Sequence, residues 1–180
     1  MRLAVLAAVL LCALTGCASA TPSPEAPAEF VLSSPDLDAD GYLPEWAVGN
    51  AEGFCDGENR SPQLDWSGAP DGTKAFAITM TDPNYTPYIH WVVTGLGADV
   101  DSVASSPDGQ IAGAVLGASG EGAGAPGTYV GPCVVDNGYL YTVYALDEEI
   151  EGAADTTLLD FVDLTMDHVL ATAELEIKRH

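Results

Sequence analysis

Residues 61–80 read SPQLDWSGAPDGTKAFAITM and hold two runs that are typical of β-strands, separated by a turn. In the first run Leu64 and Trp66 fall on one face, because side chains alternate between the two faces of a strand. In residues 74–80, Phe, Ile and Met alternate with smaller side chains, which gives the second run one large apolar face. Gly, Pro and Asp in residues 68–72 are typical of a turn. The stretch therefore predicts two strands, each with an apolar face to bury.

Runs of the same kind recur along the rest of the chain. Residues 90–94 are almost all apolar, which favours a central strand that is buried on both faces. Residues 98–127 are dominated by Gly and Ala and predict a long flexible loop. Further strands are expected at residues 30–33, 139–146 and 173–177. Short strands with turns between them predict a mainly β fold, built as an all-β sandwich or a similar packing of sheets.

The C-terminal part changes from a strand pattern to a helix pattern. Asp155 or Thr156 can cap a helix that runs to about Val162, with leucines at a spacing of three to four residues. Thr165 can cap a second helix that runs through Leu170. We therefore expect one or two short helices near the C terminus, before the last strand.

The chain begins with a segment that is typical of a lipoprotein signal peptide. Residues 1–16 hold a basic start and an apolar core that is too short to span a bilayer as a stable helix. The sequence Leu-Thr-Gly-Cys ends at Cys17 and resembles a lipobox, in which the cysteine thiol accepts the lipid. The alternative is an ordinary signal peptide that contains a cysteine. Residues 17–29 then form the lipidated cysteine and a flexible tether rich in Pro, Ser and Ala, followed by one domain over residues 30–180.

This interpretation of the N terminus predicts where in the cell the protein is located. Acyl chains on Cys17 would hold the protein on a membrane, because each buried methylene contributes about 0.8 kcal/mol. We therefore expect an extracytoplasmic protein that is lipid-anchored to the membrane, at the cell surface or on its periplasmic face.

The charge of the chain is strongly acidic. It has 27 Asp and Glu against five Lys and Arg, a net charge of −22. Nucleic-acid binding is excluded as a function, because phosphate contacts require clustered basic side chains. Attraction to anionic lipid surfaces is excluded for the same reason. The acidic surface either keeps an extracytoplasmic protein soluble or is an adaptation to a salty medium.

Two cysteines remain in the expected domain, Cys55 and Cys133. An even pair in an oxidising compartment favours one disulfide between them. The alternative is a pair of thiols at a metal site, but neither cysteine has another Cys or His at ligand spacing. The sequence therefore predicts a disulfide, no metal site and no cofactor.

The richest candidate site is a proline-stiffened loop and the strand that follows it. Asp82 and Pro83 end one strand, and His90 opens the next, where an Asp near a His can orient the imidazole. A second Gly-Pro loop at residues 129–133 precedes the Tyr-rich strand, so the two loops together can form a small cavity with polar walls. The alternative is that Asp82 caps a turn and His90 is a core histidine with satisfied hydrogen bonds.

Several segments, in this order, carry a resemblance to a known family. They are residues 55–66 (CDGENRSPQLDW), 68–74 (GAPDGTK), 82–84 (DPN) with His90-Trp91, 129–133 (YVGPC), 141–146 (YTVYAL) and 168–175 (HVLATAEL). Over residues 30–177 the chain resembles the phosphatidylethanolamine-binding protein family, in particular its bacterial YbhB/YbcL (Raf kinase inhibitor-like) branch. The motif Asn-x-Ser-Pro-x-Leu-x-Trp joined to Gly-Ala-Pro is the most specific part of the match.

The resemblance implies a fold and a site. The fold is an antiparallel β-sandwich core with one or two short helices near the C terminus. The site is a small pocket that accepts phosphate-like and other anionic groups. The residues that match the pocket positions are Asp82, Pro83, His90, Gly131 and Pro132, with Tyr129 beside them.

Two departures from the family pattern bear on the ligand. In the first loop the usual second Asp is Asn84, and the usual Pro is displaced to Pro87. In the second loop the usual His-Arg-Tyr triplet is replaced by Tyr139-Leu140-Tyr141, so a histidine and an arginine are missing. Tyr139 retains a hydroxyl donor but brings no positive charge. We therefore expect a ligand that is small and either anionic or polar.

Three functions fit these observations, in order of preference. The first is a non-enzymatic binding protein with a small ligand at Asp82, His90, Tyr129 and Tyr139. The second is a protein-interaction role, such as modulation of a protease or a kinase. The third is a hydrolase, which ranks last because Asp and His make only part of a nucleophilic triad and the sequence has no Gly-x-Ser-x-Gly elbow. The sequence makes no prediction about the oligomeric state.

Overall fold

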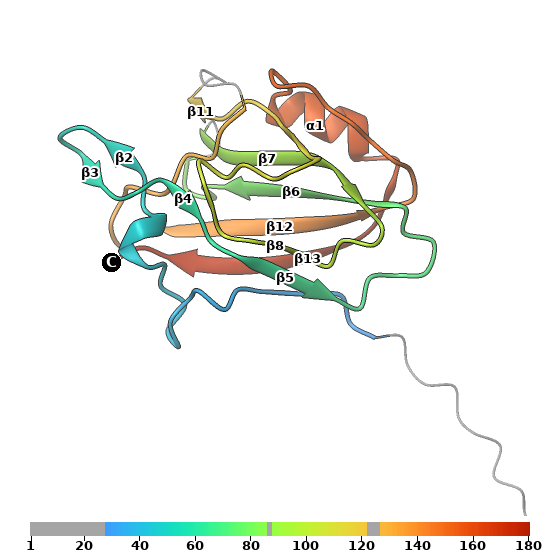
Figure 1. Ribbon diagram of the computed structural model, residues 1–180, viewed down its shortest axis with the longest axis horizontal. Coiled ribbons are helices and arrows are strands. Elements are labelled where there is room, and N and C mark those ends of the chain that lie inside the picture. Colours follow the sequence, from blue (N-terminus) through green and yellow to red (C-terminus); the bar gives the residue numbers. More distant parts are fainter. Residues whose placement is uncertain (1–27, 86–87, 122–126) are drawn as a thin grey trace, which may run out of the picture.

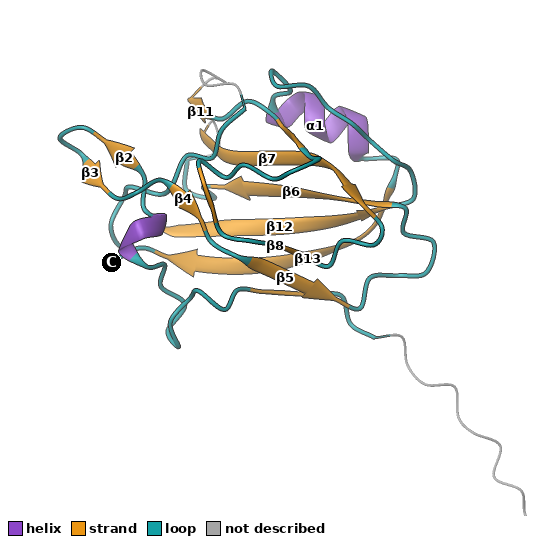
Figure 2. Cartoon of the chain, viewed as in Figure 1, coloured by secondary structure: helices purple, strands orange, loops and turns teal. Residues whose placement is uncertain are grey.

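Figure 1 shows the computed structural model of the chain, which describes residues 28–85, 88–121 and 127–180. The predicted signal peptide (residues 1–16), the lipidation site Cys17, nearly all of the predicted tether and Pro87 lie outside the described residues. Figure 2 shows that strands and loops make up most of the described chain, with helix only at η1 and α1. No helix among the described residues is long and apolar enough to cross a membrane.

The larger of two main sheets has six strands, and every pair in it is antiparallel. The order is β10-β7-β6-β12-β13, and β11 pairs with another part of β7. The strands are β6 (Ala75–Thr81), β7 (Tyr88–Gly97), β10 (Val115–Leu116), β11 (Gly120–Glu121), β12 (Gly138–Leu146) and β13 (Val169–Lys178). The predicted mainly β, antiparallel fold is confirmed.

The smaller main sheet has the order β1-β5-β8 and is also antiparallel. Two further antiparallel pairs, β2 with β3 and β4 with β9, form separate two-stranded sheets. The bounds of these elements are β1 (Val31–Ser33), β2 (Asn50–Ala51), β3 (Cys55–Asp56), β4 (Arg60–Ser61), β5 (Leu64–Ser67), β8 (Ser102–Val103) and β9 (Ser106–Pro107). One 3-10 turn, η1 (Glu45–Ala47), precedes β2, and one α-helix, α1 (Leu158–Thr165), lies between β12 and β13.

The main hydrophobic core lies between the two sheets. Leu64 and Trp66 of β5 are buried in it, as the two-residue period predicted. The indole of Trp66 packs on the ring of Phe76 in β6, with 5.4 Å between ring centroids. The alternate residues Ile78 and Met80 enter the same core. Figure 1 shows β5 and β8 running over the face of the larger sheet, so the fold is a sandwich.

The other face of the larger sheet is covered by α1. Ala75 and Ala77 of β6 face this side and share a second apolar cluster with Phe161 of the helix. Phe161 also meets the ring of Tyr144 edge-on, at 5.1 Å between centroids. Strands β6 and β7 are therefore buried on both faces, which confirms the prediction for residues 90–94.

The predicted helices are confirmed in part. A helix forms, but its N-cap is Thr157 and not Asp155 or Thr156, because Thr157 and Asp160 form a capping box. The second predicted helix is wrong: Thr165 is the last residue of α1, and its hydroxyl donates to the carbonyl of Phe161 at 2.8 Å. Strand β13 begins at Val169 and pairs along its length with β12, and this sheet pairing outweighs the local helix signal.

The predicted long loop over residues 98–127 is wrong in part. It contains the two-residue strands β8, β9, β10 and β11. Strands β8, β10 and β11 pair with the longer strands β5 and β7, whereas β9 pairs with the equally short β4. Such short pairs form through backbone hydrogen bonds, which require no alternation of large side chains. A Gly- and Ala-rich sequence therefore gave no sign of them. The predicted strand over residues 61–66 is also divided, into β4 and β5.

Candidate functional site

A pocket of about 370 Å³ opens where β6, β7 and β12 end near the loop that precedes β12. Five of the seven ligand-binding residues predicted from the sequence line it: Asp82, His90, Tyr129, Gly131 and Tyr139. The other two, Pro83 and Pro132, are not among its lining residues. Pro83 follows Asp82 in the chain and is exposed, whereas Pro132 is a buried residue of the second loop.

Asp82 follows the last residue of β6 and is only 7% exposed. One carboxylate oxygen accepts hydrogen bonds from the backbone N–H groups of Asn84 (2.8 Å) and Tyr85 (3.1 Å), which holds the turn. The other oxygen accepts from the side-chain amide of Asn137 at 2.8 Å. The carboxylate is therefore fixed by three neutral donors, and it has no basic partner among them.

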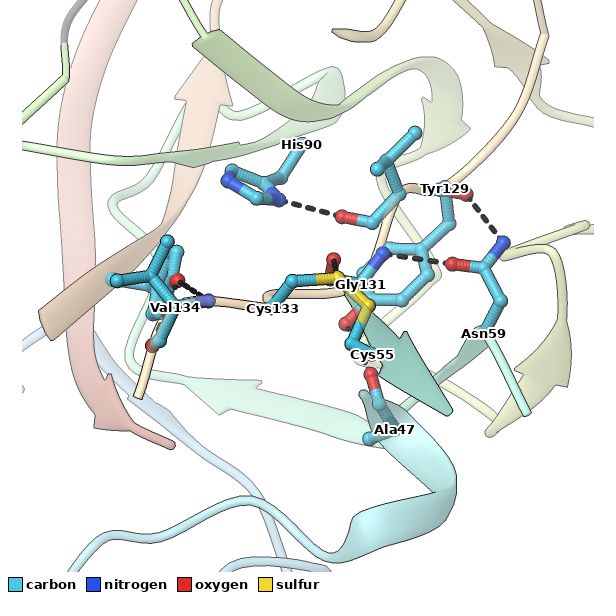
Figure 3. The surroundings of a disulfide bond; sticks show 10 residues. Ala47, Cys55, Asn59, His90, Tyr129, Gly131, Cys133 and Val134 are labelled. Atoms are coloured by element: carbon cyan, nitrogen blue, oxygen red, sulfur yellow. Dashed lines mark hydrogen bonds between the residues drawn. A yellow bond between two sulfur atoms is a disulfide. The ribbon is translucent and has the colours of Figure 1, made fainter. Parts of the chain in front are cut away.

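His90 lies in β7 and is 4% exposed. Its Nδ1 is 2.6 Å from the carbonyl oxygen of Val130, as Figure 3 shows, so Nδ1 carries the proton and Nε2 is the acceptor of the neutral ring. Burial lowers the pKa of His90, while the bond to Val130 and the charge of Asp82 oppose that shift. The imidazole is therefore neutral at pH 7.

Tyr139 packs edge-on against His90, with 5.1 Å between ring centroids. Its hydroxyl accepts from the backbone N–H of Val134 at 3.0 Å and donates to the carbonyl of the same residue at 3.2 Å. Burial raises the pKa of Tyr139, partly offset by hydrogen bonds from its neighbours. The hydroxyl that stands in place of the family histidine is therefore held by the wall of the pocket.

Tyr129 is buried completely, and its hydroxyl points into the main core. That hydroxyl donates to the carbonyl of Ala47 at 3.2 Å and lies 3.1 Å from the hydroxyl of Tyr141. Burial raises the pKa of both tyrosines. Tyr129 thus lines the pocket, but its hydroxyl is committed to Ala47 and Tyr141, away from a ligand.

The loop that carries Gly131 is joined to the N-terminal half by the predicted disulfide. Cys55 and Cys133 are bonded, with 5.5 Å between their Cα atoms, which confirms the pairing (Figure 3). Gly131 lies against Gly49 so closely that a Cβ atom on Gly131 would be 2.5 Å from the backbone nitrogen of Gly49. The glycine in this loop is therefore required for the close approach of two backbones.

Asn59 is a second link between the N-terminal half and the loop that carries Gly131, and the sequence did not indicate this role. Its side-chain amide donates to the carbonyl of Tyr129 (2.9 Å) and to the carboxylate of Asp108 (3.0 Å). Its side-chain oxygen accepts from the backbone N–H of Gly131 at 2.8 Å. Asn59 has a φ of 53°, a left-handed conformation in which Asn is favoured over most residues. In the sequence Asn59 stands out only as part of a family motif, because its partners are 49 to 72 residues away.

Three aromatic side chains that the sequence did not mark, Phe54, Tyr85 and Tyr88, also line the pocket. Tyr88 lies between Tyr85 and His90, with centroid distances of 6.3 Å and 4.7 Å. Phe54 and Val134 also line the pocket, and both are exposed, at 68% and 48%. The positions of Tyr85 and Tyr88 beside the proline-stiffened loop were the only available signal.

The sequence profile of the phosphatidylethanolamine-binding proteins matches residues 23–180, which include every residue of the pocket. The chain belongs to the phosphatidylethanolamine-binding protein family. The resemblance found in the sequence is thus confirmed at the level of the family.

Individual relatives agree with this assignment. The chain is 35% identical over 130 residues to the UPF0098 protein YbhB of Escherichia coli, covering 66% of this chain and 78% of YbhB. The crystal structure of E. coli YbcL, described as a new member of the mammalian PEBP family, matches with a TM-score of 0.74 at 29% identity, covering 85% of this chain and 99% of YbcL. The chain is also 35% identical over 98 residues to the "Putative lipoprotein LppC" of Mycobacterium tuberculosis, covering 51% of this chain and 46% of that protein.

The described residues of this family member contain no group of three or more His, Cys, Asp or Glu side chains that is arranged to hold a metal ion. His168, the other histidine in the domain before the C-terminal residue, pairs with Asp147 at 3.0 Å on the surface. The pocket therefore remains the one candidate site that the predicted residues form.

Asn59 offers a test of how the pocket loop is held. Asn59→Gly, which tolerates the positive φ, should lower the free energy of unfolding by about 1–3 kcal/mol through the lost hydrogen bonds. Asn59→Ala should lose about 1 kcal/mol more, because alanine is strained at this φ. Urea unfolding measures both values. If both variants stay within about 0.5 kcal/mol of the original chain, Asn59 does not secure the loop.

The neutral state of His90 predicts a pH dependence of stability. Its pKa is lowered in the folded protein, so the unfolded chain takes up the proton first as the pH falls. The free energy of unfolding should therefore decrease below about pH 6.5, by at most about 1.4 kcal/mol per pH unit from this group. Urea unfolding from pH 8 to pH 5 should show a smaller decrease in His90→Asn, which can still donate to Val130. Parallel pH profiles for the two proteins would contradict this assignment.

Proposed function

We propose that this chain is a non-enzymatic binding protein that holds a small anionic or polar ligand in the pocket around Asp82 and His90. The observation that carries the proposal is the convergence of these two buried polar side chains on one cavity of about 370 Å³. Small-molecule sites are typically cavities of this size with mainly apolar walls and a few fixed polar groups. Membership of a family named for binding a phospholipid adds support.

The hydrogen bonds of the pocket favour binding over catalysis. His90 uses Nδ1 to bind the carbonyl of Val130, and so it is not oriented by a carboxylate as in a nucleophilic triad. The described residues that line the pocket include no serine, and the single cysteine among them, Cys133, is in the disulfide. The hydroxyl of Thr128 donates to a backbone carbonyl. A hydrolase would need a nucleophile next to a base, and the described lining residues do not supply that pair.

A second candidate is the protein-interaction role predicted from the sequence. It is favoured by exposed apolar side chains: Phe54 (68%) and Val134 (48%) line the pocket, and Val135 (52%) is the next residue in the chain. Such exposed apolar groups are typical of contact sites. A partner protein could insert one polar side chain into the pocket and cover these residues.

We further propose that the protein is extracytoplasmic and anchored through a lipid on Cys17. The motif at residues 14–17 supports this, together with the relative whose name describes it as a lipoprotein. The Cys55–Cys133 disulfide fits an oxidising compartment.

The binding proposal is tested by thermal unfolding with a panel of ligands. Phosphate, phosphoethanolamine, acetate and choline are each added to the purified chain. A ligand at 100 times its dissociation constant should stabilise the folded state by about 2.7 kcal/mol, which raises the melting temperature. His90→Ala should abolish that increase. If no ligand raises the melting temperature, the binding proposal fails.

The anchor is tested by labelling cells that express the full chain with a fatty acid. We expect label on the original chain and none on Cys17→Ala, because only the thiol of the lipobox cysteine accepts the lipid. Cys12→Ala is the matched control and should be labelled normally. Equal labelling of all three chains, or of none, would contradict lipidation at Cys17.

A further inference from the structure

Helix α1 carries an apolar stripe on its exposed side as well as its buried one. Residues at spacings of three and four share one face of an α-helix. Phe161 and Thr165 are the buried residues of α1, and they lie on the face toward the sheet. A second set at the same spacing, Leu159, Val162 and Met166, is exposed at 77%, 43% and 62%. Packing of α1 on the sheet therefore leaves a second apolar stripe open to solvent.

The exposed stripe of α1 is a row, unlike the scattered apolar side chains that are normal on protein surfaces, and such rows are typical of contact sites. From Leu159 to Met166 it covers two helical turns, a length of about 10 Å. The helix lies at the periphery of the fold (Figure 1). The flexible thioether of Met166 adapts readily to the shape of a partner. The stripe therefore fits one short amphipathic segment better than a broad, flat partner.

An acidic stripe runs beside the apolar one. Each of the three apolar residues is followed directly by an aspartate, at positions 160, 163 and 167. Asp160 acts within the helix, where it forms the capping box with Thr157. Asp163 and Asp167 are exposed, and none of the ion pairs among the described residues involves them. Two carboxylates are therefore left to interact with a group from outside the chain.

These two carboxylates lie at the unfavourable end of α1. The C-terminal end of a helix carries partial negative charge and is stabilised by cations. The last turn of α1 has no basic residue, and it holds Asp163, with Asp167 just beyond it. The acidity of the whole chain accounts for surface carboxylates in general, but not for their regular position beside an apolar row. A cation from a partner would be attracted both by the carboxylates and by the helix end.

We propose that α1 docks a basic amphipathic helix of a partner protein. Apolar side chains of the partner would pack on Leu159, Val162 and Met166, and its Lys or Arg side chains would pair with Asp163 and Asp167. The partner segment is helical because the spacing of three and four residues on α1 matches the spacing on another helix. The inference goes beyond the ligand proposed for the pocket and does not depend on it.

Charge selects this occupant over two others. A second copy of the chain would bring its own acidic stripe against this one, and like charges would repel each other. A bilayer of anionic lipids would be repelled for the same reason. A basic helix is attracted instead, since the surface that it covers is both apolar and acidic.

Titration of the purified chain with three synthetic peptides tests the proposal. One peptide has Leu at helical spacing flanked by Lys, the second has Glu in place of Lys, and the third has the Leu and Lys residues in scrambled order. At physiological ionic strength the first should bind at least about tenfold more tightly than the other two. No binding of the first peptide would overturn the proposal. Equal binding of the scrambled peptide would also overturn it, because the net charge of −22 alone would then explain the affinity.

Variants of the apolar stripe locate the contact. Leu159→Ser combined with Met166→Ser should weaken binding of the ordered Lys peptide at least about fivefold, through the lost apolar contact. The matched control is Val31→Ser combined with Val135→Ser, because these side chains are exposed at 44% and 52% outside α1. Circular dichroism confirms that each variant is folded. Weakening by the control pair, or none by the α1 pair, would overturn the proposal.

Variants of the acidic stripe separate local from total charge. Asp163→Asn combined with Asp167→Asn should weaken binding of the same peptide about fivefold or more. Glu52→Gln combined with Asp56→Asn is the matched control, because it removes the same charge from exposed residues around the β2–β3 hairpin, far from α1 (Figure 1). An equal effect of the two pairs would overturn the proposal, since total charge would then account for binding.

The two other occupants have their own measurements. Sedimentation equilibrium would reveal a dimer that is lost in Leu159→Ser combined with Met166→Ser, and this would assign the stripe to a second copy. Sedimentation with phosphatidylcholine vesicles would reveal binding that is lost in the same variant, and this would assign it to a bilayer. Either result would overturn the proposal. None of these outcomes affects the binding function of the pocket, which the ligand panel tests separately.

Discussion

Burial of the large side chains between the two sheets is the constraint on which the site depends. Trp66 and Phe76 are in contact across the sandwich, and the alternating residues that follow Phe76 keep β6 in register with its neighbours. Because β6, β7 and β12 are packed in this way, their ends bring Asp82, His90 and Tyr139 to one place. A shift of one residue in any of these strands would turn its pocket residue to the other face.

The loops that complete the pocket are held by polar and covalent links in addition to the burial of Tyr129 in the core. Asn59 binds the backbone of the second loop at two points, and the disulfide joins the same loop to β3. The tyrosine hydroxyls near the site also form hydrogen bonds within the protein. The hydroxyl of Tyr129 donates to the carbonyl of Ala47, and that of Tyr139 accepts from the N–H of Val134. The polar groups of the pocket are therefore held in fixed positions by the fold, which lowers the entropy cost of binding at such a site.

The parts of the structure that the sequence predicted are those with a local signal. The strand faces of Leu64 and Trp66 followed from alternation, and the family motifs placed Asp82 and His90 together. The parts that it missed depend on contacts between distant residues. The role of Asn59 depends on partners 49 to 72 residues away, and the second helix was lost to pairing with β12, which local spacing cannot reveal.

The disulfide has a consequence for how this site comes into being. Its two cysteines are 78 residues apart, and the strands β6 and β7 lie between them in the sequence. A growing chain can therefore pair β6 with β7 well before Cys133 has been synthesised. The loop that carries Gly131 and Cys133 completes the pocket only later. The scaffold is available early in biosynthesis, and the recognition surface is completed only when the second loop has arrived and the environment is oxidising. In this way completion of the pocket is tied to the redox state of the environment in which the chain folds.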